Sequence, residues 1–64
     1  ISEIASAITR AEANIEHIGV TDQNAHMSVI KAVIHIQGRR HLARVMRKIR
    51  NIKAVIRIQR IVNH

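Results

Sequence analysis

The sequence predicts an α+β fold in which two helices cover one face of an antiparallel sheet. Apolar residues recur at helical spacing in two segments, near residues 2–13 and 39–50. They alternate with polar residues in three others, near residues 15–21, 26–37 and 54–62. The predicted order is therefore helix, strand, strand, helix, strand. A chain of 64 residues forms one small domain at most, and core burial alone gives such a domain roughly 3–5 kcal/mol of stability.

The first helix is expected over residues 2–13. Its apolar residues lie three or four positions apart, which places them on one side of a helix. They are Ile1, Ile4, Ala5, Ile8 and Ala11. Asn14 follows them, and asparagine readily takes the left-handed conformation found where helices end. We therefore interpret Asn14 as the residue that stops the helix.

Two strands are expected next, joined by the turn-forming residues 22–25, which read DQNA. If these four residues form the loop, Glu16 faces Lys31 and Ile18 faces Val29. The opposite charges of Glu16 and Lys31 favour this register. A shift by one residue would turn every side chain of one strand to the other face of the sheet.

The second helix is expected over residues 39–50, with Gly38 as its N-cap. It is strongly amphipathic, with one apolar stripe and one basic stripe on opposite sides. The apolar stripe holds Leu42, Val45, Met46 and Ile49, and the basic stripe holds Arg40, Arg44, Arg47 and Lys48. The segment AVIRIQRIV then alternates again and predicts a third strand at about residues 54–62.

One face of the predicted sheet packs on the helices, and the other is more apolar than a solvent-facing surface needs to be. The apolar residues of this second face include Ile18, Val29, Val33 and Val55. Large apolar patches usually mark interfaces. We therefore expect a partner to cover this face, either a second copy of the chain or a neighbouring domain of a longer protein.

The charge of the chain is divided between its two halves. Residues 1–30 carry one arginine against four acids, and residues 31–64 carry ten Lys and Arg and no acid. This division favours an anionic partner on the basic side, although a solvated basic face that serves solubility gives the same pattern. Phosphate binding by the basic stripe would be sensitive to salt. Stacking on RNA bases is not expected, because the chain has no aromatic residue.

The sequence shows no pattern typical of an enzyme, a metal site or a membrane span. It has no Cys, no GxSxG motif and no glycine-rich phosphate loop, and its four carboxylates are scattered. Its five His form no ligand-spaced cluster, so no metal and no cofactor is expected. No apolar run is long enough to span a membrane. We expect a non-enzymatic, cytoplasmic protein, and the absence of Cys fits that compartment.

Two segments resemble a known family. ITRAEANIEHIGV, residues 8–20, and HLARVMRKIRNIKAVIRIQR, residues 41–60, are similar to the C-terminal ACT domain of RelA/SpoT-type (p)ppGpp synthetase/hydrolases, the GTP pyrophosphokinase family. The resemblance covers nearly all of the chain, and HLARVMRKIR is its most specific part. It implies a ferredoxin-like ACT sandwich of order βαββαβ and a regulatory, non-catalytic function in the stringent response of bacteria. Synthesis and hydrolysis would reside in distant domains.

The family pattern begins with a strand, whereas this sequence opens directly in the first helix. In the family's sheet that strand lies at the centre, between the third and fourth strands of the pattern. Without it, two strands would each keep an unpaired edge, which is a template for pairing with another chain. We therefore expect residues 1–64 to form a single ACT domain that lacks its N-terminal strand, or receives that strand from a partner.

The resemblance also implies ligands and partners. ACT domains commonly dimerise and bind amino acids where the first strand meets the first helix, so Ile4, Asn14 and Ile15 are the candidate effector contacts. C-terminal domains of the long RelA/SpoT enzymes lie against ribosomal RNA, which the basic stripe would contact. The domain would then relay ribosome or amino-acid status to distant catalytic domains. The alternatives are an RNA-contacting module for rRNA or tRNA, and a pure dimerisation module.

Overall fold

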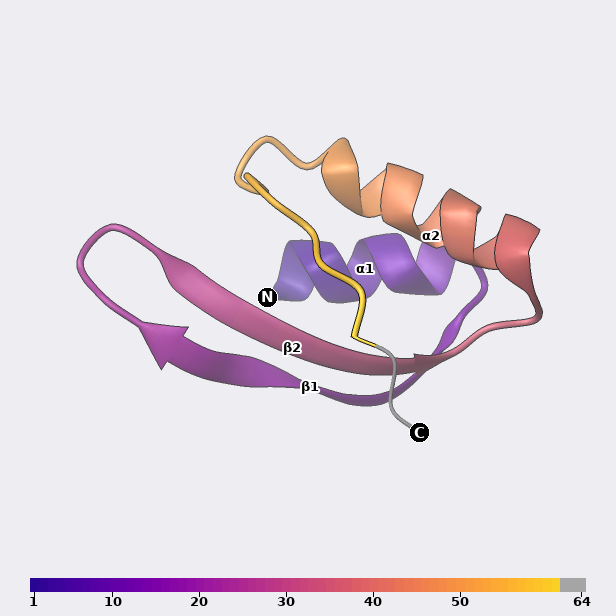
Figure 1. Ribbon diagram of the computed structural model, residues 1–64, viewed down its shortest axis with the longest axis horizontal. Helices are drawn as coiled ribbons and strands as arrows, with labels where there is room; N and C mark the ends of the chain where they lie inside the picture. Colours follow the sequence, from indigo (N-terminus) through magenta and orange to yellow (C-terminus); the bar gives the residue numbers. More distant parts are fainter. Residues whose placement is uncertain (62–64) are drawn as a thin grey trace.

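The computed structural model describes residues 1–61 and confirms the predicted α+β architecture. Helix α1 (Ser2–Arg10) is followed by strands β1 (Asn14–Gln23) and β2 (Ser28–His35) and by helix α2 (Arg39–Arg50). Both helices lie on the same side of the β1–β2 hairpin, whose turn extends beyond them (Figure 1). Helix α1 contacts both α2 and β1, so it joins the helical layer to the sheet.

Helix α1 ends earlier than predicted, and Asn14 is not its stop. Glu12 adopts the left-handed conformation with φ 63°, its N–H donates to Thr9 O at 2.9 Å, and Ala13 N–H donates to Ile8 O at 3.2 Å. These two hydrogen bonds form a Schellman motif, in which Ala13 packs back on Ile8. Ile8 and Ala13 are both buried, so core packing places the reversal of the chain at Glu12. Asn14 is then the first residue of β1.

Strands β1 and β2 are antiparallel, but their register differs from the predicted one. Lys31 faces Gly19 instead of Glu16, and Ile18 faces Ala32 instead of Val29. The register shifts twice, between Ile15 and His17 and between Val20 and Asp22, and each shift places an extra residue on β1. The aligned pairs are Asn14–His35, Ile15–Ile34, His17–Val33, Ile18–Ala32, Gly19–Lys31, Val20–Ile30, Asp22–Val29 and Gln23–Ser28.

The turn of the hairpin explains part of this difference. Asn24 Oδ1 accepts hydrogen bonds from the backbone N–H groups of His26 and Met27, both at 2.8 Å. The N–H of Asn24 donates to Met27 O at 2.9 Å. The side chain of Asn24 therefore moves the turn to residues 24–27, two positions beyond the predicted loop.

The register decides which side chains face the helices. Ile18 packs against the core with Ile15 and Ile34, so its predicted placement on the opposite face is wrong. Val29 and Val33 alternate with the half-buried Ile30 and Ile34 and face away from the helices. They are 52% and 37% exposed.

The predicted third strand does not form in the part of the chain that the structure describes. Residues 55–61 carry no strand, and residue 62 of the predicted range lies outside the described residues. The segment leaves α2 through a turn in which Val55 N–H donates to Ile52 O at 3.0 Å, and then runs back past α1 (Figure 1). A strand exists only by pairing with another, and the two strands within residues 1–61 pair with each other. Val55 therefore lies on no sheet face.

The core is small and centres on the contact between the two helices. Ile8 of α1 and Val45 of α2 are the largest fully buried side chains, and Ala11 and Ala13 complete the buried cluster. Half-buried isoleucines from both helices, both strands and the segment after β2 surround it. They are Ile4, Ile15, Ile18, Ile34, Ile36 and Ile49.

The left-handed Glu12 provides a test of the observed helix end. Glycine adopts this conformation without a Cβ penalty, so Glu12→Gly should raise the free energy of unfolding by about 0.5–1 kcal/mol. Glu12→Ala removes the same carboxylate but keeps the Cβ, and should not stabilise the chain. Urea denaturation of the three proteins measures the difference. Equal stability of the Gly and Ala variants would contradict the left-handed assignment.

Candidate functional site

The C-terminal end of α1 is held to α2 by two side chains. His41 Nε2 lies 2.7 Å from Ala11 O, and Arg44 Nη2 donates to the same oxygen at 3.1 Å. The backbone N–H of Gln37 donates to His41 Nδ1 at 2.8 Å. Because Nδ1 accepts this bond, Nε2 carries the ring proton and donates it to Ala11 O. Carbonyls at a helix C-terminus lack partners within the helix, so these donors satisfy one of them.

The basic stripe of α2 is exposed to solvent, as its spacing predicts. Arg40, Arg44, Arg47 and Lys48 are all exposed, on a helix whose buried residue is Val45. Within residues 1–61 the structure records one ion pair, in which His35 Nε2 lies 3.5 Å from Glu16 Oε2. The Lys and Arg side chains of that range therefore form no ion pair with a carboxylate. The stripe is available to an external anion.

Arg44 differs from the other three members of this stripe. Its guanidinium donates to Ala11 O while the side chain stays exposed. The spacing of the basic residues places Arg44 in the stripe but does not reveal its contact with α1, because that contact joins residues 33 positions apart. Arg44 thus belongs both to the basic stripe and to the packing of the helices.

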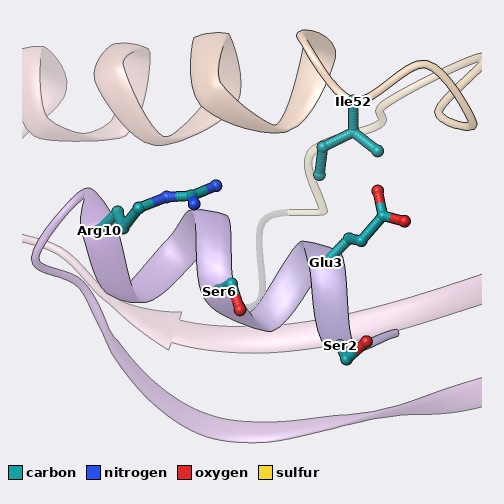
Figure 2. A pocket seen from close by; sticks show the side chains of 5 residues that line it. All are labelled: Ser2, Glu3, Ser6, Arg10 and Ile52. Carbon is teal, nitrogen blue, oxygen red and sulfur yellow. The ribbon is translucent and has the colours of Figure 1, made fainter.

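A shallow pocket of about 250 Å³ lies between the exposed side of α1 and the chain that follows α2. It is lined by Ser2, Glu3, Ser6, Arg10 and Ile52, and we call it the α1 pocket. Figure 2 shows the carboxylate of Glu3 reaching toward Ile52, and the side chain of Arg10 extending from the other end of the helix back along it. No ion pair joins Glu3 to Arg10 within the described residues. A carboxylate and a guanidinium two turns apart on α1, with serine hydroxyls and the apolar Ile52 in the same lining, suit a small zwitterionic molecule.

The residues predicted to contact an effector lie elsewhere. Ile4 and Ile15 pack against the core, and the exposed Asn14 begins β1, opposite His35. The structure therefore does not bring these three residues into the α1 pocket. Ser2, Ser6 and Arg10, which were not predicted, recur every four residues on the polar side of α1. That spacing was visible in the sequence, but the wall formed by Ile52 was not.

The predicted interface residues are also separated. Val29 and Val33 share the exposed face of β2, whereas Ile18 faces the core and Val55 lies in the segment after α2. The exposed apolar face is therefore narrower than the sequence predicted.

The comparison with protein families gives the context for these surfaces. A family model of the ACT domain matches residues 1–60. The chain belongs to the ACT domain family. ACT domains are small-molecule-binding regulatory domains and are not catalytic themselves. No curated protein and no solved structure matches the chain.

Two further features of this ACT domain concern metals and membranes. Within residues 1–61, no three His, Asp or Glu side chains gather in a way that would hold a metal ion. Over the same range, no helix is both long and apolar enough to cross a bilayer.

The contact between the helices can be tested by comparing two arginines of α2. Arg44→Ala removes a donor from Ala11 O and should lower the free energy of unfolding by about 1 kcal/mol. His41→Ala should cost a similar amount, because it also leaves the Gln37 N–H without its acceptor. Arg47→Ala, an exposed control on the same helix, should stay within about 0.5 kcal/mol of the parent. Urea denaturation measures all three, and an equal loss in the Arg47 variant would show that general charge effects dominate.

Proposed function

We propose that this ACT domain is the C-terminal regulatory domain of a stringent-response enzyme, a (p)ppGpp synthetase/hydrolase of the bacterial cytoplasm. The family match supports the regulatory part of this proposal. The segment HLARVMRKIR, residues 41–50, which resembles RelA/SpoT-type enzymes and forms most of α2, supports the rest. The domain itself performs no chemistry. It relays ribosome or amino-acid status to distant catalytic domains that make or hydrolyse (p)ppGpp.

The α1 pocket is the observation that carries the small-molecule part of this function. An α-amino acid bears an ammonium group and a carboxylate, which match Glu3 and Arg10 in the lining of the pocket. An aliphatic side chain would lie against Ile52. To regulate a longer protein, such a ligand must bind one arrangement of it more tightly than another.

We further propose that a strand from outside residues 1–64 completes the sheet. Among the described residues, β2 pairs with β1 along one edge, and residues 55–61, whose apolar and polar residues largely alternate in the sequence, form no strand. A strand placed between β2 and residues 55–61 would pair with both. It would come from the parent protein or from a second copy, and Val29 and Val33 would then form part of a dimer or domain interface.

Isothermal titration calorimetry tests the effector. Leucine, isoleucine or valine should bind saturably, and Arg10→Gln or Glu3→Gln should each weaken binding about tenfold, which is 1.4 kcal/mol. Glu12→Gln is the matched control, because it removes an exposed carboxylate of the same region that does not line the pocket. Isopentylamine, which lacks a carboxylate, should not bind. Binding of this amine as tightly as leucine, or equal weakening by the Glu12 variant, would exclude recognition of both charges.

An RNA-contacting module is the second candidate, and the basic stripe, which forms no ion pair within residues 1–61, favours it. Replacing Arg40, Arg47 and Lys48 together by Glu should abolish RNA binding, because three positive charges of the stripe become negative. The fold should be kept, because these side chains are exposed and do not support the core. Binding by the parent should weaken with salt, with a logarithmic slope near −0.7 per phosphate contacted on single strands. It should depend little on sequence, since phosphate contacts position the protein without reading bases.

The control for this experiment changes the same charge elsewhere. Arg10, Lys31 and Arg57 replaced together by Glu alter the net charge equally but leave the stripe intact. Equal loss of RNA binding in both variants would indicate attraction by net charge alone. A parent protein that binds neither RNA nor amino acids but sediments as a dimer, broken by Val33→Asp, would favour the dimerisation module instead.

A further inference from the structure

A second pocket, of about 380 Å³, lies where the start of α2 meets the C-terminal segment. It is lined by Ile36, Gly38, Arg39, Leu42 and Arg60, and we call it the Arg39–Arg60 pocket. It shares no residue with the α1 pocket. Its two arginines come from segments that are separate in the sequence, and the fold brings them to the same hollow.

The charges of this pocket are not balanced within the described residues. No acidic residue lines it, and all four acids of the chain precede residue 23. Within residues 1–61 neither Arg39 nor Arg60 is engaged in an ion pair or a side-chain hydrogen bond of the kind that holds Arg44. Two cations that line one hollow repel each other. An anion bound between them would remove that repulsion.

The shape and chemistry of the pocket define the class of anion. Guanidinium groups are planar forks that bind oxyanions through two parallel hydrogen bonds. A phosphate monoester carries a charge of about −1.5 to −2 at pH 7, which balances two arginines, whereas one carboxylate balances only one. Ile36 and Leu42 are half-buried and give the pocket an apolar wall. Its volume is in the range of pockets that hold small molecules.

We propose that the Arg39–Arg60 pocket binds a small organic phosphate monoester. The phosphate lies between the guanidinium groups of Arg39 and Arg60, and the carbon part lies on Ile36 and Leu42. Binding would also fix residue 60 against the start of α2, in the arrangement that residues 55–61 adopt without an added strand. The phosphate would then join the C-terminal segment to α2, which no ion pair or side-chain hydrogen bond does within the described residues.

Phenyl phosphate is a suitable probe, because it joins a phosphate dianion to one apolar ring. In titrations of the ¹⁵N-labelled chain followed by NMR, the amide signals of Gly38 and Arg39 should shift and saturate. Inorganic phosphate, which lacks the ring, and benzoate, which lacks the second charge, should each bind at least several-fold more weakly. Arg39→Gln and Arg60→Gln should each weaken phenyl phosphate binding at least fivefold. Both residues are exposed, and the spectrum of each variant shows whether the fold is kept.

Arg50→Gln and Arg57→Gln are the matched controls, because each removes one positive charge from outside the pocket. Both should bind phenyl phosphate as the parent does. Equal weakening by all four variants, or no shift at Gly38 and Arg39, would overturn the proposal. If inorganic phosphate binds as tightly as phenyl phosphate, the proposed contact of the ligand's carbon part with Ile36 and Leu42 is wrong. An RNA oligonucleotide that displaces phenyl phosphate and depends more strongly on Arg39 and Arg60 would reassign the pocket to phosphodiesters.

Discussion

The packing of the end of α1 against α2 determines how the rest of the domain is arranged. Ile8 and Val45 are fully buried there, and two donors from α2 meet the carbonyl oxygen of Ala11. The reversal of the chain at Glu12 follows from this contact, because it brings Ala13 into the same cluster. It also sets the direction in which β1 leaves the helix. With so small a core, loss of this contact would remove a large part of the stability of the fold.

This contact also places the candidate surfaces. Each helix uses one side for the core, which leaves the polar side of α1 and the basic side of α2 at the surface. The two surfaces therefore lie on different elements, but the same packing supports both. Arg44 is a direct physical link, because one guanidinium is part of the basic stripe and also donates to the end of α1. Contacts of this kind can carry coupling between ligands at separate sites.

The sequence predicted α2 with its observed bounds, because a strict apolar period and Gly38 mark both its interior and its start. It overextended α1, because Ala11 and Ala13 suit a helix as well as a core, and only their burial near Val45 decides between the two. Alternation cannot reveal the two irregularities of β1, since each becomes visible only against the partner strand. The strand expected near residue 54 depends on a partner edge, which is not a local property of the segment.

The candidate sites divide in the same way. The basic stripe could be predicted because its residues lie within three turns of one helix. The two pockets could not be predicted, because Ile52 approaches α1, and Arg60 approaches the start of α2, only in the folded chain.

The double use of Arg44 has a consequence for how homologous sequences should vary. Within residues 1–61, Arg47 and Lys48 form no ion pair or side-chain hydrogen bond, so nothing in the fold distinguishes arginine from lysine at these positions. At position 44, a planar group with five separate N–H donors can bind a carbonyl and still face outward, whereas a compact ammonium concentrates its charge at one point. Evolutionary drift should therefore be slower at residue 44 than at its neighbours in the stripe.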